Sequence, residues 1–324
     1  MIGLAHVYVI GGVFFAACAW FSARDRSNPK RFFSAAFWAL LAVSFLAGDR
    51  LGDLGNGLLV VGLVVVAALG MGRSTQPTST PEERRASAQR HRDRLFAVAL
   101  VIPASAFAGT LLAKQTRWGA RLIDPAQATL VSLVLGVLLA IAVAQLWLRF
   151  ARSRREILLP LREGRRLLES VGWAAILPQM LASLGVVFLA SGVGTQVGRL
   201  FSEHLTLGTR LAAVAAYAGG MALFTMLMGN AFAAFPVMTA AVGLPVVVRQ
   251  FGGEPAVVCA IGMLSGFCGT LMTPMAANFN IVPANLLELP DRDAPFNAVI
   301  RTQIPTAIPL LAANILLMWW LAWR

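Results

Sequence analysis

The sequence predicts an all-α polytopic membrane protein with about eight to ten transmembrane segments. Hydrophobic residues make up 58% of the 324 residues and charged residues only 13%, whereas a soluble domain carries about 25% charged residues. Residues 211–248 contain no Asp, Glu, Lys, Arg or His. As one helix this stretch would be about 57 Å long, so it has to turn or break within a hydrocarbon core about 30 Å thick.

The basic residues are concentrated in three segments between apolar stretches. The formal net charge is +12, and residues 24–31, 73–94 and 149–166 hold 4, 6 and 7 of the 27 Lys and Arg residues. Basic loops of this kind mark the cytoplasmic side of a membrane protein. We therefore expect a multi-pass protein of the bacterial inner membrane, with its N-terminus outside and a lipid bilayer, not nucleic acid, as its surroundings.

This orientation can be tested by cysteine labelling. In a background without the native cysteines, single cysteines placed in residues 24–31, 73–94 and 149–166 should react with an impermeant maleimide only after the cells are opened. A cysteine beside Met1 should react in intact cells. Labelling of residues 73–94 from the periplasm would reverse the predicted orientation.

Residues 1–150 are predicted to form an N-terminal helical scaffold of five spans. Asp49, Arg50 and Asp53 form a short predicted loop, and residues 73–94 are predicted to be a mobile linker because they are polar and rich in Pro, Ser and Thr. Each predicted span is an apolar run bounded by polar residues: residues 2–21, 32–47, 56–71, 95–113 and 126–148.

Residues 151–170 are predicted to connect the two halves of the chain on the cytoplasmic face. Leucines alternate there with arginines, which is typical of an interfacial amphipathic helix; a solvated connector is the alternative. We expect a sixth span at residues 171–190, followed by a short external or interfacial piece at residues 191–210.

The third predicted region, residues 171–324, contains two long uncharged stretches with polar interruptions. Residues 211–248 are expected to break within 229–236, where a glycine, an amide and a proline stand together. Residues 255–287 also exceed one span and are expected to be interrupted at residues 266–269 and again within residues 270–280. The last predicted span, residues 304–323, ends in an interfacial aromatic anchor made of Trp319, Trp320 and Trp323 beside Arg324.

Polar side chains in the uncharged stretches are the candidate binding groups. An unpaired amide in hydrocarbon is costly, so each has to meet a partner, a water or a ligand. Holding helices together is one interpretation. Binding is favoured for amides beside a glycine or proline break, because backbone groups are freed at the same place. The candidates are Asn230, Thr239, Thr270, Thr273, Asn278, Asn280 and Asn285.

The chemistry of these breaks favours an anionic ligand. Freed helix N-termini carry positive partial charge and suit a carboxylate, and freed carbonyls suit Na⁺. The stretches contain no Asp or Glu, so a proton relay confined to them is not expected. We expect no bound cofactor, with Na⁺ as the coupling ion or H⁺ carried by a titratable group on a partner.

Two runs resemble a known family. MGNAFAAFPVMTAAVGLPVVV (residues 228–248) and AIGMLSGFCGTLMTPMAANFNIVPANLLEL (residues 260–289) resemble the larger membrane subunit of the bacterial two-subunit 5-oxoproline transporter. More distantly they are similar to the ion-transporter superfamily of anion carriers. That resemblance implies a re-entrant hairpin with its tip at Gly229-Asn230-Ala231. It also implies a broken helix centred on Thr273-Pro274 and Asn278.

The chain departs from the superfamily at the hairpin tip. The usual Ser-Asn-Thr reads Gly-Asn-Ala here, which weakens the case for Na⁺ coordination at the tip. One hairpin and one broken helix amount to one repeat, and the resemblance implies two repeats in a full carrier. The second would come from a second small polytopic membrane subunit.

We therefore expect a subunit of a secondary active transporter that moves a small carboxylate by alternating access. The resemblance suggests 5-oxoproline as that carboxylate. A non-transporting scaffold for a partner permease and a channel are the alternatives. An enzyme is not expected, because no GxSxG, GxGD or HExxH pattern is present. The predicted substrate or ion site consists of Gly229, Asn230, Ala231, Thr270, Thr273, Pro274, Asn278 and Asn280.

Overall fold

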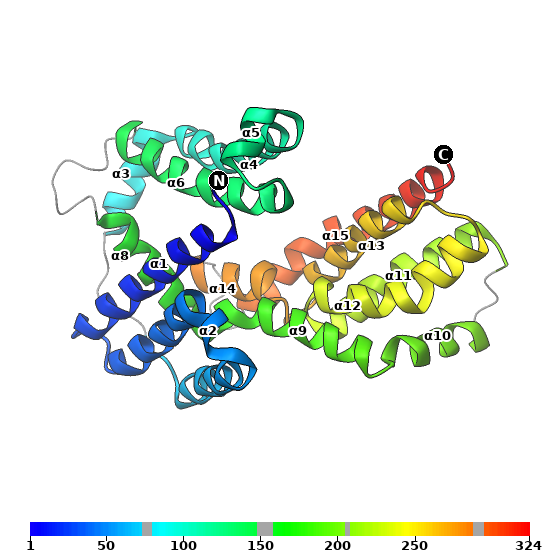
Figure 1. Cartoon of the computed structure of the whole chain (residues 1–324), viewed down its shortest axis with the longest axis horizontal. Helices are drawn as coiled ribbons and strands as arrows, with labels where there is room; N and C mark the ends of the chain where they lie inside the picture. The colour runs from blue at the N-terminus through cyan, green and yellow to red at the C-terminus, as the bar shows by residue number, and fades with distance from the viewer. Residues whose placement is uncertain (73–79, 148–157, 205–207, 288–294) are drawn as a thin grey trace. The chain divides into compact units, whose positions relative to one another are not determined.

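The computed structural model of the chain describes residues 1–72, 80–147, 158–204, 208–287 and 295–324. Within these residues the protein is all-α, and eight helical stretches are long and apolar enough to cross a bilayer. The predicted fold class, an all-α polytopic membrane protein, is confirmed. The chain divides into two compact units, Met1–Gly172 and Trp173–Arg324 (Figure 1).

The first unit contains two pairs of packed apolar helices. Helix α1 (Leu4–Arg24) packs along α2 (Arg31–Leu69), and α4 (Arg94–Gln115) packs along α6 (Ala128–Trp147). Two short elements connect the second pair, α5 (Arg117–Leu122) and the 3₁₀ turn η1 (Pro125–Gln127).

The loop predicted around Asp49 and Asp53 is a kink inside α2. Gly52 has φ 62° and ψ −176°, a left-handed backbone conformation that interrupts the helix and that glycine adopts without steric cost. The Asn56 amide donates 2.9 Å hydrogen bonds to the carbonyls of Gly48 and Gly52. These bonds connect the helical turn after the kink to the turn before it.

The prediction of a linker at residues 73–94 is wrong for its second half, because helix α3 (Pro81–His91) forms there. Residues 73–79 lie outside the described residues. Thr80 Oγ1 accepts a 3.2 Å hydrogen bond from the Glu83 N–H, and the Thr80 N–H donates a 2.9 Å bond to Glu83 Oε2. This reciprocal capping box is readable in sequence as Thr-x-x-Glu, and the Pro/Ser/Thr-rich composition obscured it.

Helix α8 (Leu159–Val171) occupies the predicted connector; residues 151–157 lie outside the described residues. Its charged side packs on protein. Arg165 Nη1 lies 2.9 Å from Asp25 Oδ2, and Ser22 donates a 2.5 Å hydrogen bond to the buried Glu169 carboxylate. Leu159 and Leu167 are exposed. Helix α8 therefore presents these two leucines outward, where lipid can cover them.

The second unit carries the candidate site. Its elements are the 3₁₀ turn η2 (Gly172–Ile176), α9 (Leu177–Ala190), α10 (Val193–His204), α11 (Arg210–Met228), α12 (Ala231–Met238), the π-helix η3 (Thr239–Gln250), α13 (Pro255–Leu271), the π-helical turn η4 (Ala277–Ile281), α14 (Val282–Leu286) and α15 (Pro295–Leu321). Helices α11, α13 and α15 pack against one another and form the core of this unit (Figure 1).

The short external or interfacial piece predicted at residues 191–210 contains helix α10. Helix α10 packs along η3, and a Cβ placed on Gly194 or Gly198 would lie 3.3 Å from Val237 O or 3.1 Å from Ala241 O. Glycines four residues apart let two helices approach this closely. The flanking polar residues hid this pattern, because only the neighbouring helix shows that the glycine face is buried.

Tyr217 lies at the centre of the core of the second unit. Its fully buried ring lies in a slot between Gly243 and Gly262, and its hydroxyl is hydrogen bonded to Thr239 Oγ1 at 2.9 Å. Thr239 is thus paired within the core, at the first residue of the π-helix. A Cβ on Gly262 would overlap the Tyr217 hydroxyl.

Gly262→Ala is expected to destabilise the protein by about 1–3 kcal/mol, because the ring cannot leave its slot without repacking the core. Gly219→Ala on α11 is the matched control, since a Cβ there meets nothing within 4 Å and alanine favours a helix over glycine. Thermal unfolding in detergent should show a lower Tm for Gly262→Ala alone. Equal Tm values would contradict the rigid slot.

Candidate functional site

The first chain break is a two-residue turn between α11 and α12. Gly229 has φ 73° in the left-handed region, and its N–H donates a 2.7 Å hydrogen bond to Thr225 O. Asn230 follows as the N-cap of α12, where its Oδ1 accepts a 2.8 Å hydrogen bond from the Phe232 N–H. Glycine after a helix and asparagine before one are the residues that this geometry favours.

The turn lies at the start of the predicted break at residues 229–236, whereas Pro236 is inside α12. The arms of the hairpin have 19 residues in α11 and 20 residues in α12 and η3 together. At 1.5 Å per residue the α11 arm is about 28 Å long, close to the length of a full membrane span, whereas the second arm is shorter because the π-helix η3 rises less per residue.

The second break separates α13 from η4. The interruption predicted at residues 266–269 is wrong, because α13 continues through them and Gly269 packs closely on Ala222 of α11. The α-helix ends at Leu271, and helical structure resumes at Ala277. The Asn280 amide, which is fully buried, donates hydrogen bonds of 2.9 and 2.6 Å to the carbonyls of Thr270 and Thr273. Asn280 therefore stabilises the open end of α13, where carbonyls have lost their helical donors.

The two breaks touch each other. Thr273 Oγ1 donates a 2.9 Å hydrogen bond to Met226 O in the last turn of α11. A Cβ on Gly229 would lie 2.8 Å from Met275 Cβ and 3.0 Å from Met275 O. Gly229 is thus required both for its positive φ and for the close approach of Met275.

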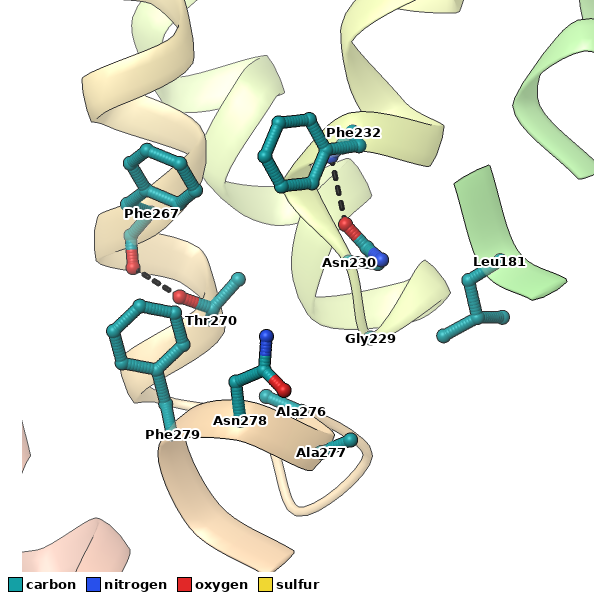
Figure 2. A pocket seen from close by; sticks show the side chains of 10 residues that line it. All are labelled: Leu181, Gly229, Asn230, Phe232, Phe267, Thr270, Ala276, Ala277, Asn278 and Phe279. Atoms are coloured by element: carbon teal, nitrogen blue, oxygen red, sulfur yellow. Dashed lines mark hydrogen bonds between the residues drawn. The ribbon is translucent and has the colours of Figure 1, made fainter. Parts of the chain in front are cut away.

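A pocket of about 30 Å³ lies where the breaks meet. Its polar groups come from Asn230, Thr270 and Asn278, and Figure 2 shows the Asn278 amide pointing from η4 toward the hairpin turn. This volume holds one or two waters or an ion and is too small for an organic acid. The described residues that line the pocket are uncharged: Leu181, Gly229, Asn230, Phe232, Phe267, Thr270, Ala276, Ala277, Asn278 and Phe279.

Three phenyl rings form one wall of the pocket. The Phe267 ring centroid lies 5.8 Å from that of Phe232 and 6.2 Å from that of Phe279. Edge-to-face and tilted pairs at this spacing are favourable for aromatic rings. The wall fixes the apolar side of the pocket opposite the amides (Figure 2).

Helix α15 indicates the depth of the pocket. The Glu254 N–H, just before α13, donates a 2.7 Å hydrogen bond to Ala322 O. Toward the N-terminus of α15, the Asn314 amide contacts Cys268 Sγ, and the Gln303 amide donates a hydrogen bond to Phe279 O. These two contacts lie roughly 12 and 28 Å from Ala322 along the helix. Phe279 is one of the lining residues of the pocket, so the pocket lies near the level of Gln303, at the end of these helices opposite Ala322.

The predicted site residues divide into those that line the pocket and those that support it. Gly229, Asn230, Thr270 and Asn278 line it, although the Thr270 hydroxyl donates to Phe267 O of its own helix at 2.5 Å. The other predicted residues lie beside the pocket and support it. Ala231 packs on Gly266, and Thr273 and Asn280 make the hydrogen bonds described above. Pro274 is exposed.

Two of the wider candidates lie elsewhere. Thr239 is paired with Tyr217, and the Asn285 amide donates a 2.8 Å hydrogen bond to Ile281 O in its own turn. Sequence reasoning missed the apolar lining residues, because Phe232, Phe267 and Leu181 give no distinguishing signal inside apolar runs. Leu181 comes from α9, far away in sequence.

Comparison with known proteins identifies one family. Residues 5–323 match the family described as "Protein of unknown function (DUF979)". No curated protein and no solved structure matches the chain. The family match covers both units.

Proposed function

The chain belongs to the DUF979 family, and from the pocket between its two chain breaks we propose that it is a subunit of a secondary active transporter for a small carboxylate. The observation that carries the proposal is the meeting of Asn230 and Asn278 at two interrupted helices. In membrane proteins, open backbone persists where it lines a cavity, and transporters build their sites there.

The proposed binding mode uses neutral donors. The N-terminus of α12 begins at the pocket and carries positive partial charge. The Asn278 amide can donate to a carboxylate oxygen, so a single anionic group is accommodated without a lysine or arginine. Na⁺ or H⁺ is the proposed coupling ion, with Na⁺ suited to carbonyl oxygens at the ends of α11 and α13.

Alternating access supplies the step that widens the pocket. The conformation described here has room for an ion or water only, so it corresponds to a closed, substrate-free state in the proposed cycle. Leu181 is the lining residue contributed by α9. Movement of α9 away from the two breaks would open the pocket on that side.

The resemblance of residues 228–248 and 260–289 supports 5-oxoproline as the cargo and a second small polytopic subunit as the partner. The lactam of 5-oxoproline offers one donor and one acceptor, which a single asparagine amide can match. The proposed setting is the bacterial inner membrane.

Uptake of labelled 5-oxoproline tests the proposed function. Cells that lack their own uptake system should accumulate the label when they express the chain together with the proposed partner, a second small polytopic membrane protein. Unlabelled small carboxylates should compete. Absence of uptake of every small carboxylate offered, with both proteins present in the membrane, would refute the proposal.

A further inference from the structure

Three apolar helical segments of the second unit end together, far from the pocket. Helix α11 begins at Arg210, η3 ends at Gln250, and α15 ends at Leu321. Two hydrogen bonds join these ends: Glu254 N–H to Ala322 O at 2.7 Å, and Trp323 Nε1 to Phe251 O at 2.6 Å. Since all three segments are long and apolar enough to cross a bilayer, their common end lies at the membrane–water boundary.

Guanidinium groups stack on indole rings at this end. The Arg210 guanidinium lies 5.1 Å from the centroid of the Trp323 ring, and that of Arg324 lies 3.6 Å from the Trp320 ring. A guanidinium held against a ring keeps its planar N–H edge available for a phosphate. Trp320 is about half exposed, so the stacked pair faces the surroundings of the protein.

The local charge favours an anion. Arg249 is exposed in the last turn of η3, beside the turn that accepts the Trp323 indole N–H. The exposed carboxylate of Glu254 lies on the same turn. Helices α11 and α13 also start at this end, and helix N-termini attract negative charge.

We propose that the surface formed by Arg210, Arg249, Trp320, Trp323 and Arg324 binds the headgroup of an anionic phospholipid. The indole rings lie at headgroup depth, where tryptophan is enriched, and the arginines meet the phosphate. A zwitterionic lipid brings a positive choline into the same arginines, so it binds less tightly. This lipid site is separate from the pocket and does not rest on the proposed transport function.

Native mass spectrometry of the purified full chain in detergent tests the site. Phosphatidylglycerol and phosphatidylcholine with the same acyl chains are added at equal concentrations. The unchanged protein should retain phosphatidylglycerol preferentially. The pair Arg210→Gln and Arg324→Gln should weaken that binding by about thirtyfold, because each arginine near an anionic membrane surface contributes a factor of about 5.5 in affinity and the two factors multiply.

Two further variants keep the outcome decisive. The pair Arg210→Lys and Arg324→Lys preserves charge but loses the stacked planar edge, so its phosphatidylglycerol binding should fall between that of the unchanged protein and that of the glutamine pair. The pair Arg117→Gln and Arg121→Gln removes two exposed charges from the first unit and should leave binding unchanged. Equal retention of both lipids by the unchanged protein, or an equal loss in the control pair, would overturn the proposal.

Discussion

Asn278→Ala is expected to weaken binding of the carboxylate by about ten- to a hundredfold. A hydrogen bond to a charged ligand group contributes about 1.5–3 kcal/mol, and each 1.4 kcal/mol is about tenfold in affinity. Asn278 lines the pocket and its side chain is exposed there. Its loss should therefore leave the Tm unchanged. The measurement is substrate affinity of the assembled complex, from equilibrium binding and from the concentration dependence of uptake.

The two pocket amides are expected to behave differently. Asn230 also caps α12 through the Phe232 N–H, so Asn230→Ala should lose about 1 kcal/mol of stability in addition to affinity. Asn285→Ala is the matched control, because that amide bonds only within its own turn among the contacts described.

Unchanged substrate affinity in both Asn230→Ala and Asn278→Ala would show that these amides do not bind the carboxylate. Reduced affinity in Asn285→Ala to the same extent would point to a general effect on the α13–α14 region. A lower Tm in Asn278→Ala would assign this residue a structural role instead of a binding role.

The chain alone in liposomes is expected to show no carboxylate uptake above that of empty liposomes. The second unit offers one hairpin and one broken helix around a pocket of about 30 Å³, and the resemblance implies two such repeats in a carrier. Adding the partner subunit at an equal ratio should produce uptake that depends on an ion gradient. The readout is accumulation of labelled 5-oxoproline with imposed Na⁺ or H⁺ gradients.

A complex that carries Asn278→Ala is the control for this experiment, because it should assemble and transport with lower apparent affinity. Robust uptake by the chain alone would contradict the proposal that this chain supplies only half of the binding site, and it would favour a self-sufficient homo-oligomer. That result would leave the proposed carboxylate transport intact, so the two proposals are tested separately.

The position of both breaks was predictable because the chemistry that makes them is local. Glycine tolerates the left-handed conformation that ends α11, asparagine caps the next helix, and the chain opens around Thr273 and Pro274. The all-α membrane class followed from the long uncharged runs, since an unsatisfied backbone is too costly in lipid for other structures.

Other local features were missed in the sequence or were decided by packing. Residues 191–210 were predicted to be a short external or interfacial piece, and only the structure shows that they contain α10, whose glycines pack on α12 and η3. The linker prediction for residues 73–94 missed the α3 capping box, although that signal is local and readable. The connector was expected to be amphipathic, and only the structure shows Arg165 and Glu169 facing α1.

The sequence by itself determined the membrane class, the uncharged character of the candidate site and the residues at which the chain breaks, because composition and turn chemistry act over a few residues. Tertiary structure alone decided that the two breaks touch through Thr273 and Met226, that Asn280 supports the break while Asn278 faces the pocket, and that Phe267 and Leu181 complete the lining. Neighbouring residues on one turn point in different directions, and only packing between distant segments selects which of them meets the cavity.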